Sequence, residues 1–238
     1  MDFEVLMNLG ILNCDRVSDV FAIHYGQYPE MFATLFQSIA PKMTFTVFNV
    51  IEGELPKDVH AADAYLITGS KYGVNDDYPW IASLAEFVRV LYATRKKVIG
   101  ICFGHQLIAK ALGGKVIKSP QGWGIGVLRN QIVHPQEWMH PARSHFNLLA
   151  SHQDQVVILP PDAQLLASSE FCPNNMMQIG DTMLSLQGHP EFTKAYAKDL
   201  MQSRKNIIEK EIIALGLQSL ELEHEHALIA QWLMHFLG

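Results

Sequence analysis

Cys102 is the residue whose surroundings point most directly to chemistry. The segment VIGICFGHQ at 98–106 places it where an apolar strand ends and a helix begins, with Gly100 and Gly104 two residues away on either side. Glycines at these positions permit the tight strand-to-helix turn of a nucleophile elbow. The start of the helix favours a thiolate, and the free amide of Phe103 can donate to an oxyanion. The short pattern alone fits a buried structural cysteine equally well.

A second segment, LSLQGHPEF at 184–192, supplies what a thiolate nucleophile needs. Such a nucleophile requires a general base, and the base requires a group that orients it. His189 follows an apolar strand, and Glu191 lies two residues further on. Side chains at i and i+2 of extended backbone point the same way, so the carboxylate and the imidazole can be neighbours. Taken by itself, His189 would be interpreted as an ordinary loop histidine. Together with the turn at Cys102, we expect Cys102, His189 and Glu191 to form a catalytic triad.

The elements that must position these residues follow from the hydrophobic pattern. Apolar runs predict strands at 3–12, 45–51, 64–68 and 98–102, and helical spacing predicts helices at 28–39, from Pro79 onward and at 104–112. A polar loop is expected after the first strand. The strand–helix–strand order indicates a parallel sheet with right-handed crossovers.

Between Lys115 and Gln187 the sequence pattern changes from alternating strands and helices to short strands separated by turns. Short strands are expected at 124–133, 146–151, 155–159, 163–168, 176–180 and 183–187. The last two form a hairpin turned on Gly180 and Asp181. Residues 194–238 are again helical in pattern, and we interpret 1–238 as a single domain with this C-terminal helical segment.

Composition excludes several classes of function. The 238 residues are 49% hydrophobic and carry a formal net charge of −6, which argues against a nucleic-acid or anionic-membrane surface. No apolar run reaches the length of a membrane span, and Asp2 stands where a signal peptide would carry Lys or Arg. Three scattered cysteines do not make a disulfide framework. We expect a cytoplasmic protein too short to carry a second full catalytic domain.

Four motifs in order resemble one family. GICFGHQ at 100–106 together with GHPE at 188–191 is similar to the class I (triad) glutamine amidotransferases. LITGSKYGV at 66–74 resembles the family's oxyanion loop, and SHQDQV at 151–156 resembles its S-H-x-D-x-V segment. The resemblance implies a flavodoxin-like α/β fold: an open, mostly parallel sheet with helices on both faces, plus a small antiparallel β element.

The resemblance also implies a mechanism and a site. Cys102 would attack the side-chain amide of glutamine, form a γ-glutamyl thioester and release ammonia for transfer to an acceptor. His189 would move the protons and Glu191 would orient it. The oxyanion hole would be the amides of Ser70 and Phe103, and the substrate-binding residues would be Gly69, Gln106, Ser151, His152, Gln153 and Asp154. Neither a cofactor nor a metal is implied.

Two features bear on the substrate. The family's loop usually reads Gly-Gly-Pro or Asn-Gly-Pro, whereas this chain has Gly69-Ser70-Lys71, which puts the loop geometry in question. QGWGIGV at 121–127 resembles stand-alone members of the superfamily, including plant-type γ-glutamyl peptidases that act on glutathione-like compounds. Trp123 in this segment could cover the substrate pocket.

Three functions remain open. The first is glutamine hydrolysis with ammonia passed to a separate synthetase subunit. The second is a stand-alone γ-glutamyl peptidase with the same triad, and the third is a non-catalytic amidotransferase-like binding subunit. In the first two the partner is a small molecule, and no nucleic acid or membrane is expected. His105 is expected to be packed and hydrogen-bonded rather than catalytic, and Cys14 and Cys172 to be inert.

Overall fold

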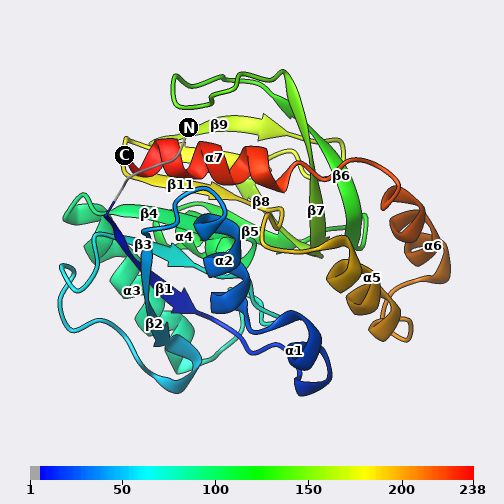
Figure 1. Ribbon diagram of the computed structural model, residues 1–238, viewed down its shortest axis with the longest axis horizontal. Helices are drawn as coiled ribbons and strands as arrows, with labels where there is room; N and C mark the ends of the chain where they lie inside the picture. Colours follow the sequence, from blue (N-terminus) through cyan, green and yellow to red (C-terminus); the bar gives the residue numbers. More distant parts are fainter. Residues whose placement is uncertain (1–5) are drawn as a thin grey trace.

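A nine-stranded sheet forms the centre of the protein, whose computed structural model describes residues 6–238 (Figure 1). The strands lie in the order β2-β1-β3-β4-β11-β10-β9-β6-β7. Their bounds are β1 Asn8–Asn13, β2 Thr44–Asn49, β3 Ala64–Ile67, β4 Lys97–Ile101, β6 Gly124–Ile132, β7 His145–His152, β9 Ala163–Ser168, β10 Met176–Ile179 and β11 Met183–Leu186. Two further strands, β5 Lys115–Lys118 and β8 Asp154–Ile158, pair as a small separate sheet.

The sheet has a parallel half and an antiparallel half. Strands β2, β1, β3, β4 and β11 are parallel, and β10, β9, β6 and β7 continue the sheet in antiparallel fashion. Strand β11 pairs with β4 in a register that places Leu186 opposite Ile101. The loops that follow β4 and β11 therefore emerge side by side at the carboxyl edge of the sheet, where ligand sites of open α/β sheets form.

Helices cover both faces of the sheet. The helices are α1 Asp19–Tyr25, α2 Tyr28–Gln37, α3 Pro79–Ala93, α4 Phe103–Ala111, α5 Lys194–Ser203, α6 Lys210–Ser219 and α7 His226–Leu237. One core joins α2 and α7 to the sheet through Phe32, Phe36 and Trp232. The other core joins α3 and α4 to the opposite face through Leu84 and Leu107. The predicted fold class is thus confirmed.

The element boundaries differ from expectation in three places. Strand β1 begins at Asn8, and residues 3–5 of the expected strand lie outside the described residues. The expected polar loop contains α1, which has no buried residue and so gives no apolar stripe in the sequence. The antiparallel strands extend the main sheet, and the small separate element is the pair β5–β8, of which β5 was not expected.

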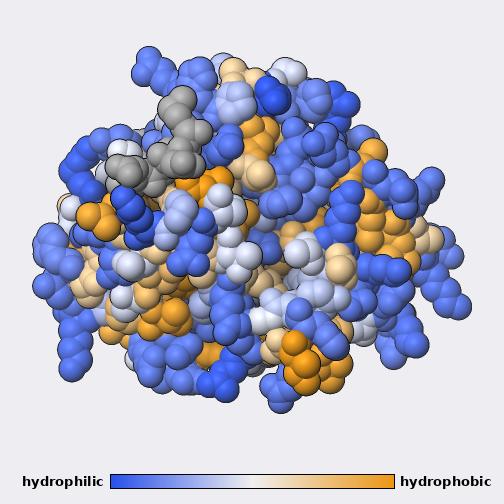
Figure 2. Space-filling model, in the orientation of Figure 1, coloured by the Kyte–Doolittle hydropathy of each residue, from blue (hydrophilic) through white to orange (hydrophobic). Residues whose placement is uncertain are grey.

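The surface in Figure 2 is mostly hydrophilic, with hydrophobic side chains gathered over α1 at the lower edge. Val20 and Ile23 are the exposed apolar residues of this helix. Among residues 6–238, no helix has the length and apolar content needed to cross a membrane.

Candidate active site

Cys102 occupies a strained turn between β4 and α4. Its backbone has φ 51° and ψ −99°, a conformation that residues with a Cβ rarely adopt. A Cβ on Gly100 would lie 2.6 Å from Ile108 Cδ1 and 2.7 Å from the carbonyl oxygen of Gly104, so glycine is required there. The local geometry is therefore that of the predicted nucleophile elbow.

His189 and Glu191 lie in the loop that follows β11, next to this turn. The Nδ1–H of His189 donates to Glu191 Oε1 at 2.7 Å, and both side chains are buried. The imidazole also stacks on Phe192, with ring centroids 4.0 Å apart and an interplanar angle of 9°. One hydrogen bond and one stacked ring therefore fix the orientation of His189.

The electrostatic surroundings of His189 favour its protonated form. Burial lowers the pKa of His189, but the charges and hydrogen bonds of Glu191 and Cys102 outweigh burial and raise this pKa to about 10. Its Nε2 atom has no hydrogen-bond partner at bonding geometry, although Cys102 is near enough to affect the pKa. Such contacts are often long in the absence of substrate and shorten when it binds.

Gly69 shows how closely the two groups approach each other. A Cβ built on Gly69 would lie 2.9 Å from His189 Cε1 and 3.6 Å from Cys102 Cβ. Both side chains thus border the same point, and a glycine is the residue that leaves this space open.

The Gly69-Ser70-Lys71 loop is held by polar contacts in place of the family's usual proline. The Ser70 hydroxyl donates to the Cys14 carbonyl at 2.8 Å and accepts from the Tyr72 amide at 3.2 Å. Asp15 accepts from the Lys71 amide at 2.8 Å and pairs with the Lys71 ammonium at 3.1 Å. The Ser70 amide itself has no acceptor among residues 6–238 and is available to a ligand.

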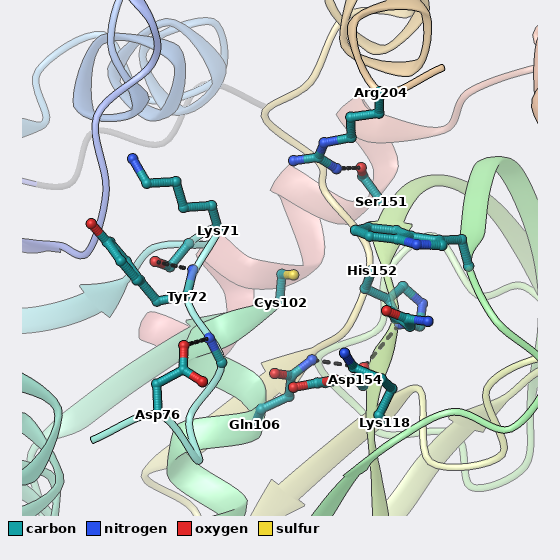
Figure 3. A pocket seen from close by; sticks show the side chains of 14 residues that line it. Lys71, Tyr72, Asp76, Cys102, Gln106, Lys118, Ser151, His152, Asp154 and Arg204 are labelled. Atoms are coloured by element: carbon teal, nitrogen blue, oxygen red, sulfur yellow. Dashed lines mark hydrogen bonds between the residues drawn. The ribbon is translucent and has the colours of Figure 1, made fainter. Parts of the chain in front are cut away.

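A cavity of about 280 Å³ opens above the Cys102 thiol (Figure 3). Of the predicted residues, it is lined by Ser70, Cys102, Gln106, Ser151, His152, Gln153 and Asp154. Gly69, Phe103, His189 and Glu191 are not among the residues that line it. Phe103 packs its ring against Trp80, at 5.4 Å between centroids, so only its backbone is in a position to serve the site.

Gln106 forms the floor of the cavity with the segment that follows β7. Its Nε2 donates to the Asp154 carbonyl at 2.8 Å and to Gln187 Oε1 at 3.0 Å. Because both amide hydrogens are used, Gln106 Oε1 remains as an acceptor. His152 is buried, and its Nδ1–H donates to the Asp154 carbonyl at 3.1 Å. Burial lowers the pKa of His152 to about 4.

Several lining residues were not predicted. These are Lys71, Tyr72, Gly73, Asp76, Lys118 and Arg204. Trp123, for which the sequence suggested a place over the pocket, also lines the cavity. Asp15, which holds the Gly69-Ser70-Lys71 loop, was also missed, although its place two residues after the end of the buried strand β1 is a recognisable signal for a residue at the carboxyl edge. Arg204 ends a helix with many exposed polar residues, and no pattern in the sequence distinguishes it from them.

The residues that the sequence analysis set aside as non-catalytic, His105, Cys14 and Cys172, are all buried. His105 is fully buried; its Nε2–H donates to the Asn174 carbonyl at 3.0 Å, and Nδ1 accepts from the Ser185 hydroxyl at 2.8 Å. Burial lowers the pKa of His105 to about 3 and raises that of Cys172 to about 12. Burial likewise raises the pKa of Cys14. Within residues 6–238, no three His, Cys, Asp or Glu side chains are grouped as metal ligands.

Comparison with known proteins identifies relatives along most of the chain. The family described as "Glutamine amidotransferase class-I" matches residues 32–209. Gamma-glutamyl peptidase 3 of Arabidopsis thaliana is 35% identical over 78% of this chain and 76% of its own length. Gamma-glutamyl peptidase 4 of the same plant is 33% identical over 74% of this chain and 72% of its own length.

Solved structures agree on the fold. The crystal structure of a glutamine amidotransferase from Thermotoga maritima superposes with a TM-score of 0.79 at 20% identity, covering 98% of this chain and 99% of the other. At that identity the likeness concerns the fold alone. Together with the family match, these findings show that the chain belongs to the class I glutamine amidotransferases.

Proposed function

We propose that this protein hydrolyses γ-glutamyl amide bonds with Cys102 as nucleophile, His189 as general acid and base, and Glu191 as the group that orients His189. The observation that carries the proposal is that a strained cysteine turn lines a cavity and that a hydrogen-bonded histidine–glutamate pair lies next to this turn. A purely binding subunit has no need of a strained elbow beside a buried, charged pair.

In the first half of the reaction, the Cys102 thiolate attacks the γ-carbonyl carbon of the substrate. The oxyanion that forms accepts hydrogen bonds from the amides of Ser70 and Phe103, each worth about 3 kcal/mol in comparable enzymes. Protonated His189 gives its proton to the departing nitrogen, the carbon–nitrogen bond breaks, and an amine or ammonia leaves. A γ-glutamyl thioester remains on Cys102.

In the second half, neutral His189 takes a proton from water as the water attacks the thioester carbonyl. The carbon–sulfur bond breaks, the γ-glutamyl group leaves as glutamate, and the Cys102 thiolate and protonated His189 are restored. Glu191 stays ionised throughout and stabilises the imidazolium. The net reaction consumes one water and yields glutamate and an amine.

The relatives favour a γ-glutamyl peptide over glutamine as the substrate. The Arabidopsis proteins that match most of this chain are named gamma-glutamyl peptidases. Glutamine, the first substrate that the motifs suggest, uses the same steps with ammonia as its leaving group. Glutamine hydrolysis coupled to a separate synthetase subunit is the second candidate, favoured by the family to which the chain belongs.

A substrate panel tests the proposal. We expect purified protein to release glutamate from γ-glutamyl dipeptides and from glutathione, with lower kcat/KM for glutamine. Glutaminase activity that rises when fractionated cell extract is added would instead select the synthetase-coupled function. Absence of turnover on the whole panel, with and without extract, would leave the chain as a binding subunit.

Gly69 offers a test of the geometry between Cys102 and His189. In Gly69→Ala the new methyl group meets His189 Cε1, and the ring cannot retreat because Phe192 stacks on it. We expect kcat to fall by about 10²-fold, the size of an effect on general acid–base catalysis, with KM nearly unchanged. Steady-state kinetics measure both constants. Gly53→Ala, which adds a methyl group in open space outside the cavity lining, is the control, and equal losses in both variants would contradict the expectation.

A further inference from the structure

We propose that Arg204 determines specificity by binding a carboxylate on the amine leaving group, so that γ-glutamyl peptides with a free C-terminus are preferred. The inference rests on the proposed γ-glutamyl hydrolysis and adds a residue and a charge requirement to it. It is carried by the placement of Arg204 in the cavity and by the distribution of charge around Cys102.

Arg204 is presented to the cavity in a fixed orientation. It follows α5, and its Nη1 donates to the Ser151 hydroxyl at 2.7 Å. Its guanidinium lies 5.3 Å above the centre of the Trp123 ring. A guanidinium carries five N–H donors, and no other acceptor for them is found among residues 6–238. Most of its hydrogen-bonding capacity is therefore free for a ligand.

The charge of Arg204 is also uncompensated. Lys71, the other cation on the same side of Cys102, is paired with Asp15. Arg204 has no carboxylate within ion-pair distance in the described part of the chain. A half-buried cation without an acidic partner, in a cavity that also holds the nucleophile, is suited to an anionic group of the substrate.

The end of the cavity opposite to Arg204 carries both acidic and basic side chains. Figure 3 shows Gln106, Asp76, Asp154 and Lys118 on the side of Cys102 opposite to Arg204. Burial raises the pKa of Asp154, and the charge of Lys118 opposes that rise, so carboxylates and an ammonium group face each other here. This mixture of signs suits the zwitterionic α-amino acid end of a γ-glutamyl group.

The position of the leaving group follows from these two ends. With the zwitterionic end at Gln106 and the γ-carbonyl at Cys102, the atoms beyond the scissile bond extend toward Arg204 (Figure 3). Glutamine has nothing beyond its amide nitrogen to reach that side. A γ-glutamyl peptide places an amino-acid residue there, and its terminal carboxylate can accept two parallel N–H bonds from a guanidinium.

Two substrate pairs measure the effect on turnover. The pairs are γ-glutamylalanine with its C-terminal amide, and γ-glutamylalanylglycine with its amide, which differ only in the terminal charge. We expect the wild-type protein to prefer the acid in at least one pair by about tenfold in kcat/KM, mainly through KM. In Arg204→Gln this ratio falls close to one, and Arg204→Lys restores part of it. Arg129→Gln removes an exposed arginine outside the cavity and keeps the ratio.

Binding to Cys102→Ala separates this inference from the proposed function. Titration calorimetry with the intact peptides should show the same preference for the acid, and Arg204→Gln in that background should remove it. If the wild type cleaves no peptide but this binding preference is present, the hydrolase proposal fails and the inference stands. If peptides are cleaved with equal kcat/KM for acid and amide, or if Arg204→Gln weakens both equally, Arg204 only positions Ser151 and the inference is wrong.

Discussion

Replacing Cys102 by alanine should abolish turnover of every γ-glutamyl substrate on the proposed mechanism, while the chain should remain folded. Without the sulfur no thioester forms, and the amide would need direct attack by water. Losses for removing a nucleophile of this kind exceed about 10⁴-fold. Cys102 is nearly buried, and alanine removes one atom from its side chain, so we expect circular dichroism and the melting temperature to stay close to wild type.

Cys172→Ala is the matched control, since Cys172 is a buried thiol outside the cavity lining, and it should retain activity. A glutamine-like diazoketone should label one cysteine, and peptide mapping by mass spectrometry should locate the label on Cys102. A label on Cys14 or Cys172, or full activity in Cys102→Ala, would place the nucleophile elsewhere.

Glu191→Gln should lower kcat by about 10²-fold or more and also change the pH profile. Glu191 raises the pKa of His189, and a glutamine lacks the charge that does so. The pKa of His189 therefore falls in the variant, and imidazolium is lost at lower pH. Because the attack needs a protonated His189 beside Cys102, the alkaline limb of kcat/KM, expected near the His189 pKa of about 10 in the wild type, moves to lower pH.

Measurement of kcat/KM between pH 6 and pH 10.5 resolves this limb. Glu223→Gln serves as the control, because Glu223 is an exposed carboxylate in the groove behind Glu191 and should leave the profile in place. A loss below about tenfold in Glu191→Gln, with an unmoved alkaline limb, would argue against Glu191 as the orienting group.

The sequence predicted the parts of the fold that bury a regular apolar pattern. Strands such as β7 and helices such as α2 and α3 were placed to within a few residues, because their buried side chains repeat at strand or helix spacing. Helix α1 was missed for the opposite reason, since none of its residues is buried. The strand β5 is four residues long with only Val116 buried, which is too little to register as a pattern.

The residues of the candidate site likewise fall into those that the sequence predicted and those that it did not. Cys102, His189 and Glu191 were found because glycine, proline and polar residues stand at fixed spacing along single segments. Arg204 and Lys118 were not found, because each is one charged residue in an exposed stretch. Only the folded chain brings the end of α5 to the end of β7, where Arg204 contacts Ser151. Residues that depend on such long-range placement carry no local signal.

The pairing of β4 with β11 also has a consequence for synthesis and folding, because it determines when Cys102 comes to lie beside His189 and Glu191. Cys102 follows β4 in the first half of the chain, whereas His189 and Glu191 follow β11 and lie on the later side of the whole antiparallel region. Contacts between segments so distant in sequence form late in folding, since a long loop must close first. During synthesis the thiol is therefore present well before its histidine, and a partly made chain contains a cysteine without a base. On the proposed mechanism, hydrolysis becomes possible when β11, the last parallel strand, is inserted into the sheet.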